Sequence, residues 1–388
     1  MPKMGRFVVE THGHITTLYQ SAKPNDPNWR GGAMAPGTGE VEPVDNSAMT
    51  LWDMDAYGVD MVLLYPSMTG TTNEAQLKLC ETYPDKFRAF CCDGGTRLEA
   101  QRGGKPWTLE RAVEEVEACL KTGKYIGIGE HNPRDFTNQF YTAEQRFYEH
   151  VPFFELARKY DVPIAIHDVV GEGVWLFDPW ALLMKLIGAY PDVKVVINHG
   201  GHSIGAYIFD DSIIRKALAC CGRSENVFLE IGTWTAEMMQ LAMEDPNVGP
   251  TQLLWGSDYG HVPQYLTQDV RRNGKMPASF CTSMKRWTPV PAYQTDWWGW
   301  GVTQITKLKE WYSQDEINLV LGGNAARLFK LPVPFERMFL SGRPDINGVN
   351  WEKTVPYVPV EQVKYPDDKR ANKELLENRK KNPPTWGP

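Results

Sequence analysis

The chain has 388 residues, of which 42% are hydrophobic and 23% are charged, a composition typical of a soluble globular enzyme. Its formal net charge is −7 and no basic cluster stands out, which argues against nucleic acid as a partner. The first residues lack the apolar core of a signal peptide and no apolar run could span a bilayer, so we expect a cytoplasmic protein without a membrane partner.

The segment from Phe7 to His14 begins with an apolar, β-branched run that predicts a buried strand. It ends in Glu10, His12 and His14, which occupy alternate positions. Alternate side chains of an extended strand point the same way, so these three are expected to converge as the ligands of a divalent metal ion do. The alternative at this point is a strand end that carries two incidental polar histidines.

Strands and helices alternate along most of the remaining chain. We expect strands at residues 60–65, 87–92, 125–129, 162–167, 193–199, 227–231 and 252–258, and helices at residues 46–57, 72–83, 109–122, 143–160, 179–190, 211–220 and 235–244. Because strands separated by helices pair in parallel, eight such units predict a closed (β/α)8 TIM barrel over residues 5–332. No Gly-x-Gly-x-x-Gly turn follows the first strand, which disfavours an open dinucleotide-binding sheet.

Three segments interrupt or follow this barrel. Residues 16–43 are rich in Pro, Gly and Asn, and we expect a long structureless loop over the end of the first strand. An insertion follows the eighth strand. The C-terminal extension, residues 333–388, lacks a long apolar helix, so we expect it to pack on the barrel or on a neighbouring subunit of a homo-oligomer, a dimer or a tetramer. A disordered tail is the alternative.

The chain has eight histidines, and half of them follow predicted strands. His12 and His14 end the first strand, His167 the fifth and His199 the sixth, while Asp258 ends the eighth. The other histidines (His131, His150, His202 and His261) are expected on loops and helices. Since active sites of (β/α)8 barrels lie at the C-terminal ends of the strands, this distribution favours a catalytic metal site.

This set of residues resembles the metal-dependent amidohydrolase superfamily. The His-x-His of the first strand, His167, His199 and Asp258 match its signature, and the segments Ile197–Gly201 and Gly322–Phe329 are similar to the "HGG" and "GNAARLL" segments of the amidohydrolase-related branch. That branch contains aromatic-acid decarboxylases, a carbon–carbon bond hydrolase and a hydratase of ring-cleavage products. The resemblance covers roughly residues 6–332 and implies metal ligands Glu10, His12, His14, His167 and Asp258.

The sequence also departs from the superfamily pattern. Members with two metals carry a bridging lysine near the end of the fourth strand, where this chain has Gly127–His131 without a lysine. We therefore expect one divalent ion, with Zn2+ favoured and Mn2+ possible, and Glu130 as a substitute ligand or a substrate contact. Glu10 resembles the decarboxylases, whereas His-Gly-His-Ile-Thr-Thr resembles the hydrolase and hydratase members.

Two reactions are compatible with these residues. The favoured one is decarboxylation of a hydroxylated aromatic carboxylic acid, in which Asp258 protonates the ring carbon and His199 assists. In the alternative, His199 or Asp258 primes a water molecule to hydrolyse a C–C or C–N bond, or to hydrate a ring-cleavage carboxylate. The unperturbed pKa of histidine, about 6.5, suits proton transfer at neutral pH.

The substrate is expected to be a small aromatic or ring-cleavage carboxylate. The chain has 14 Trp, 16 Tyr and 15 Phe, and Trp287, Trp297, Trp298 and Trp300 in the insertion could surround a ring or form an interface. Arg88, Arg272 and Arg286 are candidate carboxylate partners, and the sequence selects none of them. A non-catalytic metal-binding or scaffold protein on a barrel frame is the hypothesis from another class.

Overall fold

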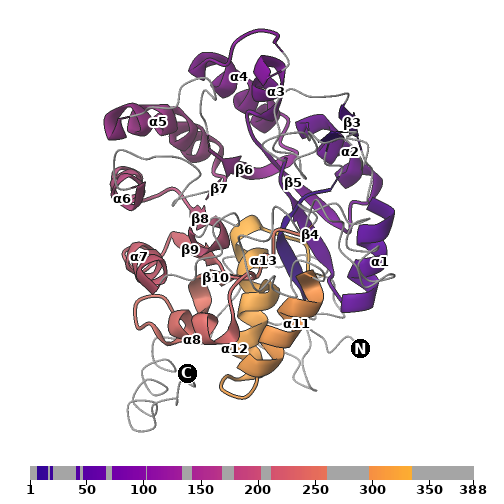
Figure 1. Ribbon diagram of the computed structural model, residues 1–388, viewed down its shortest axis with the longest axis vertical. Coiled ribbons are helices and arrows are strands. Elements are labelled where there is room, and N and C mark those ends of the chain that lie inside the picture. Colours follow the sequence, from indigo (N-terminus) through magenta and orange to yellow (C-terminus); the bar gives the residue numbers. More distant parts are fainter. Residues whose placement is uncertain are drawn as a thin grey trace, which may run out of the picture.

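The computed structural model describes residues 7–15, 18–20, 41–43, 47–66, 72–101, 103–132, 142–167, 179–201, 211–259 and 297–333. Strands lie in the middle of the molecule and helices surround them (Figure 1).

Eight parallel strands form one sheet. In spatial order, which is also chain order, they are β1 (Val9–Gly13), β4 (Met61–Leu64), β5 (Phe87–Cys91), β6 (Tyr125–His131), β7 (Ile164–Ile166), β8 (Val195–Ile197), β9 (Val227–Glu230) and β10 (Leu253–Leu254). The first and last strands meet through backbone hydrogen bonds from Thr11 N to Trp255 O (3.0 Å) and from His14 N to Tyr259 O (2.7 Å). The predicted (β/α)8 barrel is therefore confirmed.

Helices connect the successive strands and pack outside them (Figure 1). They are α1 (Ser47–Tyr57), α2 (Asn73–Thr82), α3 (Gly94–Gln101), α4 (Leu109–Lys121), α5 (Ala143–Tyr160), α6 (Pro179–Ala189), α7 (Asp211–Cys221), α8 (Ala236–Glu244), α11 (Trp297–Leu308), α12 (Gln314–Asn318) and α13 (Asn324–Phe329). Shorter helical turns are η1 (Asn198–Gly201), η3 (Pro250–Gln252) and η5 (Leu319–Gly323). Several helices begin after a threonine whose hydroxyl accepts a backbone N–H of the first turn, as at Thr108 and Thr142.

Two hydrophobic clusters hold the barrel together. One lies between the strands and the surrounding helices, and the other fills the barrel interior, where side chains such as Phe7, Phe90 and Phe228 meet residues of α13. Phe329 of α13 packs edge-to-face on Phe90, with ring centroids 5.4 Å apart. Because side chains fill the interior, chemistry is confined to the ends of the strands.

The structure also differs from the sequence-based expectations. Residues 16–43 were expected to be structureless, but their ends form a two-stranded antiparallel sheet of β2 (Leu18–Gln20) and β3 (Val41–Pro43). Helix α3 was not predicted, because its Gly-Gly start and short length give little helical signal. Residues 260–296 of the insertion, and the C-terminal extension beyond Val333, lie outside the described residues.

Within the described parts of the chain, none of the helices combines the length and apolar character needed to cross a bilayer.

Candidate metal centre

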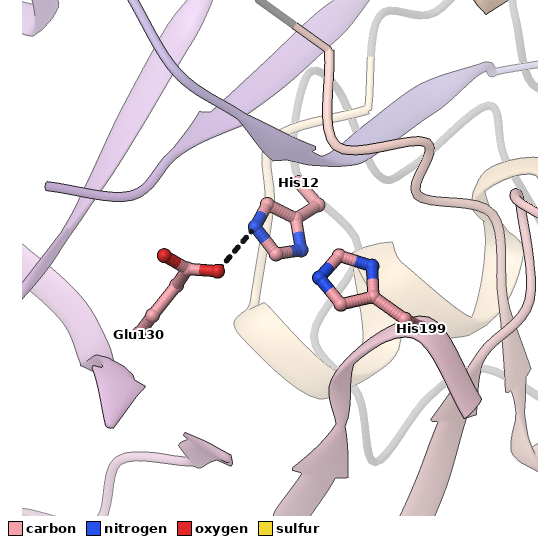
Figure 2. A group of neighbouring side chains, drawn as sticks. All are labelled: His12, Glu130 and His199. Atoms are coloured by element: carbon pink, nitrogen blue, oxygen red, sulfur yellow. Dashed lines mark ion pairs between the residues drawn. The ribbon is translucent and has the colours of Figure 1, made fainter. Parts of the chain in front are cut away.

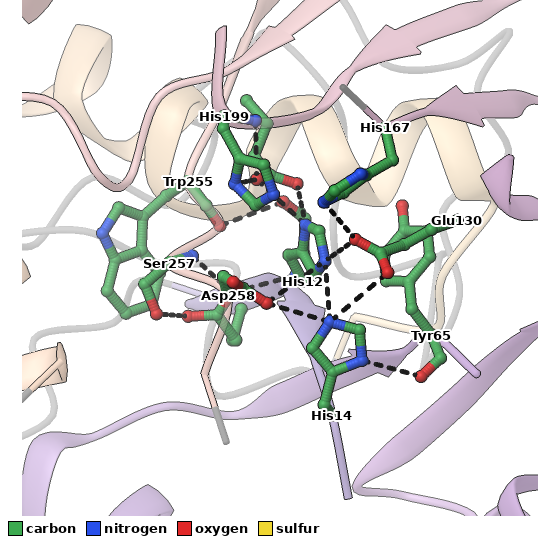
Figure 3. A network of polar contacts seen from close by, with 12 residues as sticks. His12, His14, Tyr65, Glu130, His167, His199, Trp255, Ser257 and Asp258 are labelled. Atoms are coloured by element: carbon green, nitrogen blue, oxygen red, sulfur yellow. Dashed lines mark hydrogen bonds and ion pairs between the residues drawn. The ribbon is translucent and has the colours of Figure 1, made fainter. Parts of the chain in front are cut away.

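His12 and His14 bring two ring nitrogens together at the C-terminal end of β1. Their Nε2 atoms lie 3.1 Å apart, and both side chains are buried. Figure 3 shows the two rings at the centre of a network of polar side chains contributed by several strands. Two nitrogens at this distance repel each other when both present lone pairs, unless a proton or a cation lies between them.

The other nitrogen of each ring has its own acceptor. His12 Nδ1 lies 3.0 Å from Glu230 Oε2, and His14 Nδ1 lies 3.1 Å from the backbone oxygen of Tyr65. Each Nδ1 is therefore placed to donate to its acceptor, and each Nε2, which faces the other ring, is the atom that a cation would bind. Metal-binding histidines in proteins are held in this way by carboxylates or carbonyls, so the donor set fits a divalent cation.

Two carboxylates approach the same nitrogens. Asp258 Oδ1 lies 2.9 Å from His14 Nε2 and 3.6 Å from His12 Nε2. Glu130 Oε1 lies 2.9 Å from His12 Nε2 and 3.3 Å from His167 Nε2. The structure thus brings the predicted residues His12, His14, His167 and Asp258 to one place, together with Glu130.

These side chains form two overlapping groups that could hold an ion. One group is His12, His14 and Asp258, and the other, drawn in Figure 2, is His12, Glu130 and His199. A neutral imidazole nitrogen has one lone pair, so His12 Nε2 can bind one ion at a time. The two groups are therefore alternative or shared positions of a single ion.

His199 lies directly beside this centre. Its ring stacks on that of His12 at a centroid distance of 4.7 Å, and its Nδ1 lies 3.3 Å from Glu230 Oε1. Neither ring nitrogen has a hydrogen-bond partner among the described residues, and the backbone N–H of His199 donates to Glu230 Oε1 at 3.1 Å. A histidine oriented by a carboxylate, with the other nitrogen available, is suited to proton transfer.

The backbone is strained where two of these residues are presented. His199 has φ of 54° and Asp258 has φ of 59°, in the left-handed region that costs free energy for residues other than glycine. Trp234 Nε1 donates to His199 O at 3.1 Å, and Gly200, with φ of 59°, lies against the Trp234 ring. These contacts hold His199 in a conformation that the isolated segment would rarely adopt.

The carboxylates set the electrostatics of the centre. Burial raises the pKa of Glu230, but the charge and hydrogen bond of His12, together with those of His199, outweigh burial and bring that pKa to about 2. Burial acts against ionisation of Glu130 as well, yet His167, His14 and His12 hold its pKa well below the ordinary value. Both carboxylates are therefore anionic at neutral pH and stabilise positive charge at this position.

Glu10, which was expected to be a metal ligand, accepts hydrogen bonds from donors of the protein on both carboxylate oxygens. Its Oε1 accepts hydrogen bonds from the backbone N–H groups of His12 (2.9 Å) and Ser257 (2.8 Å), and its Oε2 accepts from Ser257 Oγ (2.6 Å) and Trp298 Nε1 (2.8 Å). Burial raises the pKa of this carboxyl to about 7, against these hydrogen bonds. The pairing register of β1 shifts between Glu10 and Gly13, which breaks the simple alternation on which the expected convergence rested.

Other predicted contacts also find a place in the structure. Trp298 is buried, and its ring stacks on that of Tyr259 with the ring centroids 3.9 Å apart. The same ring donates its Nε1–H to Glu10. Arg88 donates to the backbone oxygens of Pro84 and Phe87. The side chains of Trp297 and Trp300, and residues Trp287, Arg272 and Arg286, lie outside the described part, as do His202 and His261.

Sequence reasoning missed two contributors, Glu230 and Tyr65, and misplaced one residue, His131. Glu230 and Tyr65 were not singled out, although each stands at the C-terminal end of a predicted strand, the same signal that identified His167 and His199. Glu230 was overlooked because one acidic residue in an apolar strand is weak evidence alone. His131 belongs to β6 rather than to a loop, and its Nε2 lies 2.8 Å from His150 Nδ1, away from the centre.

Known proteins provide an independent comparison. A family model described as Amidohydrolase matches residues 9–331. Among solved structures, the chain is similar to a probable 2-pyrone-4,6-dicarboxylic acid hydrolase from Acinetobacter baumannii, with 14% identity and a TM-score of 0.46 over 84% of this chain and 99% of that chain. It is also similar to a 4-oxalomesaconate hydratase from Rhodopseudomonas palustris, with 15% identity and a TM-score of 0.43 over 83% and 95% of the two chains. No curated protein matches this chain.

Proposed function

The chain belongs to the amidohydrolase family, and from that premise we propose that it is a divalent-metal-dependent enzyme that decarboxylates a hydroxylated aromatic carboxylic acid. The superfamily is typically metal-dependent, and this chain has the buried candidate groups that such an ion needs. The observation that carries the proposal is the pair of facing Nε2 atoms of His12 and His14, 3.1 Å apart, with Asp258 and Glu130 beside them.

The proposed ligands are His12, His14, His167 and Asp258, with Glu130 as an additional or alternative oxygen ligand. Glu10 is left out, because four hydrogen bonds already occupy its two oxygens. Nitrogen and carboxylate ligands of this kind suit one Zn2+, with Mn2+ as the alternative. When bound, the ion supplies positive charge that holds the substrate's carboxylate and hydroxyl oxygens and stabilises negative charge in the transition state.

Proton transfer falls to the residues of the chain itself. Asp258, as the carboxylic acid, protonates the ring carbon that bears the carboxylate. The bond to the carboxyl carbon then breaks, its electron pair returns to the ring, and CO2 leaves. His199, oriented by Glu230, assists this proton movement through Nε2.

Hydrolysis of a C–C or C–N bond is the second candidate function. The observation that favours it is His199, whose Nδ1 is next to Glu230 and whose Nε2 has no hydrogen-bond partner among the described residues. In that reaction His199 takes a proton from water, and Asp258 returns a proton to the leaving group. The same buried residues serve both reactions, so the products must distinguish them.

Isotope labelling of the products tests the proposal. Zn2+-loaded protein is incubated with a panel of hydroxybenzoates in D2O, and decarboxylation releases CO2 and places one deuterium on the ring carbon that lost the carboxylate. Hydrolysis of ring-cleavage substrates in 18O-labelled water instead places 18O in a product. His12→Ala and Asp258→Asn should abolish either signal. Metal-loaded protein that gives neither product with any substrate would support the scaffold hypothesis instead.

A further inference from the structure

A cavity lies at the opposite end of the barrel from the metal centre. Its volume is about 840 Å³, and we call it the basal cavity. Its walls come from the loops that precede β7, β8, β9 and β10 and from α13, and they include Lys194, Arg223, Phe228, Arg327, Leu328 and Lys330. Small-molecule sites in proteins typically have volumes of about 300–1,000 Å³, so the basal cavity is large enough for a metabolite.

The charge of this cavity contrasts with that of the whole chain. Four cations, Lys194, Arg223, Arg327 and Lys330, line it, together with two carboxylates, Asp161 and Glu225. The local balance is therefore positive, whereas the chain as a whole has a net charge of −7. A concave surface lined mainly by one sign of charge concentrates ions of the opposite sign.

Hydrogen bonds fix the walls of the cavity before any ligand binds. Asp161 accepts from Lys330 Nζ at 3.0 Å and lies 3.4 Å from Lys194 Nζ, and the hydrogen bond from Lys330 lowers the pKa of the Asp161 carboxyl. Gln252 Nε2 donates to the backbone oxygens of Ser224 (2.8 Å) and Val227 (2.7 Å), which holds the loop that presents Arg223. A pre-organised wall reduces the entropy lost on binding.

The lining of the cavity also includes apolar side chains. Phe228 and Leu328 are nearly fully buried members of the barrel interior. Arg327 lies 6.0 Å above the centroid of the Phe228 ring, and its Nη2 donates to Thr251 O at 2.7 Å. The lining thus combines apolar and cationic side chains, which fit the carbon skeleton and the charged groups of a small organic anion.

We propose that the basal cavity binds a small organic anion with two or more negative charges on carboxylate or phosphate groups. Lysine and arginine bind both kinds of oxyanion, and arginine does so with parallel hydrogen bonds. This site is separate from the metal centre and does not depend on the proposed function. Arg223 is the most informative residue, because it is exposed and the described residues show no partner for its guanidinium group.

Calorimetric titration of the full-length, metal-loaded protein tests this site. The probes are propane-1,2,3-tricarboxylate and glycerol 2-phosphate, which distinguish carboxylate from phosphate recognition. We expect saturable binding of at least one probe with one site per chain. The double variant Lys194→Gln/Arg223→Gln should weaken that binding at least tenfold in 0.1 M salt, and the single variant Arg223→Glu should do so without a change in the unfolding midpoint, since this side chain is exposed.

Two controls separate the basal cavity from other sites. Lys105→Gln removes an exposed lysine that does not line the cavity, and it should leave the affinity unchanged. His12→Ala disrupts the metal centre and should also leave it unchanged. The proposal is overturned if neither probe binds saturably, or if both variants of the basal cavity retain full affinity, whatever the effect of His12→Ala.

Discussion

Replacement of Glu230 by glutamine should weaken metal binding without removing any proposed ligand. Glu230 is fully buried, lies 3.0 Å from His12 Nδ1, and accepts the backbone N–H of His199 at 3.1 Å. Glutamine keeps one acceptor oxygen but loses the negative charge and turns an N–H group towards one of these donors. The net loss is close to one charge-assisted hydrogen bond, or about 1.5–3 kcal/mol.

That loss corresponds to roughly a 10- to 100-fold fall in metal affinity, the range known for residues that orient metal-binding histidines. A competition titration against a chromophoric zinc chelator at constant pH measures it. Glu115→Gln is the matched control, because Glu115 is a partly buried carboxylate that accepts N–H groups from Gly95 (2.9 Å) and Thr96 (2.7 Å) elsewhere in the barrel. If Glu230→Gln costs no more affinity than Glu115→Gln, the orienting role assigned to Glu230 is wrong.

Three further variants test other parts of the structure. Glu10→Gln should retain one metal ion per chain by elemental analysis, in contrast to His14→Ala. It should lower the free energy of unfolding by about 1–3 kcal/mol, since the amide places a donor against Ser257 or Trp298. Loss of the ion from Glu10→Gln would show that Glu10 is a ligand. His150→Asn tests the pH dependence of stability. Burial, followed by the charge of Arg146, holds the pKa of His150 well below its ordinary value. The unfolded chain therefore binds a proton on His150 that the folded chain does not, and the free energy of unfolding falls as the pH drops through about 6.5. In urea titrations the native protein should lose about 1.4 kcal/mol more than this variant between pH 7.5 and 5.5, and equal losses would refute the shift. Gly200→Ala should lower the free energy of unfolding by about 2–4 kcal/mol. A Cβ at this position would lie 2.1 Å from the Trp234 ring, and the backbone φ of the residue is positive. A variant as stable as the native protein would show that this contact relaxes freely.

The barrel could be predicted because its signals are local. Each strand is a short apolar run and most helices are amphipathic, so their alternation, and hence the parallel order of the sheet, can be recognised without knowledge of tertiary contacts. The same reasoning located His167 and His199, since residues that follow successive parallel strands meet at one end of a barrel. The prediction for His12 and His14 needed only their spacing of two residues.

The orientation of Glu10 could not be predicted, because it depends on distant parts of the chain. Its partners Ser257 and Trp298 are 247 and 288 residues away, and neither pairing leaves a trace in local sequence. The role of Tyr65 could not be predicted either, because its contact to His14 Nδ1 is made by the backbone oxygen. Every residue has such an oxygen, so the sequence carries no signal for it. Sequence patterns therefore identified the residues that surround the centre better than they identified which atoms face it.

Strand β9 runs from the basal cavity towards the metal centre and carries a residue of each. It is four residues long, and Phe228, which lines the basal cavity, is two positions before Glu230, which contacts His12 and His199. Two positions of one strand therefore separate the two sites along the chain. By thermodynamic reciprocity, any factor by which an anion beside Phe228 changes the metal affinity equals the factor by which the metal changes the anion affinity, and the unchanged anion binding expected in His12→Ala sets both factors to one.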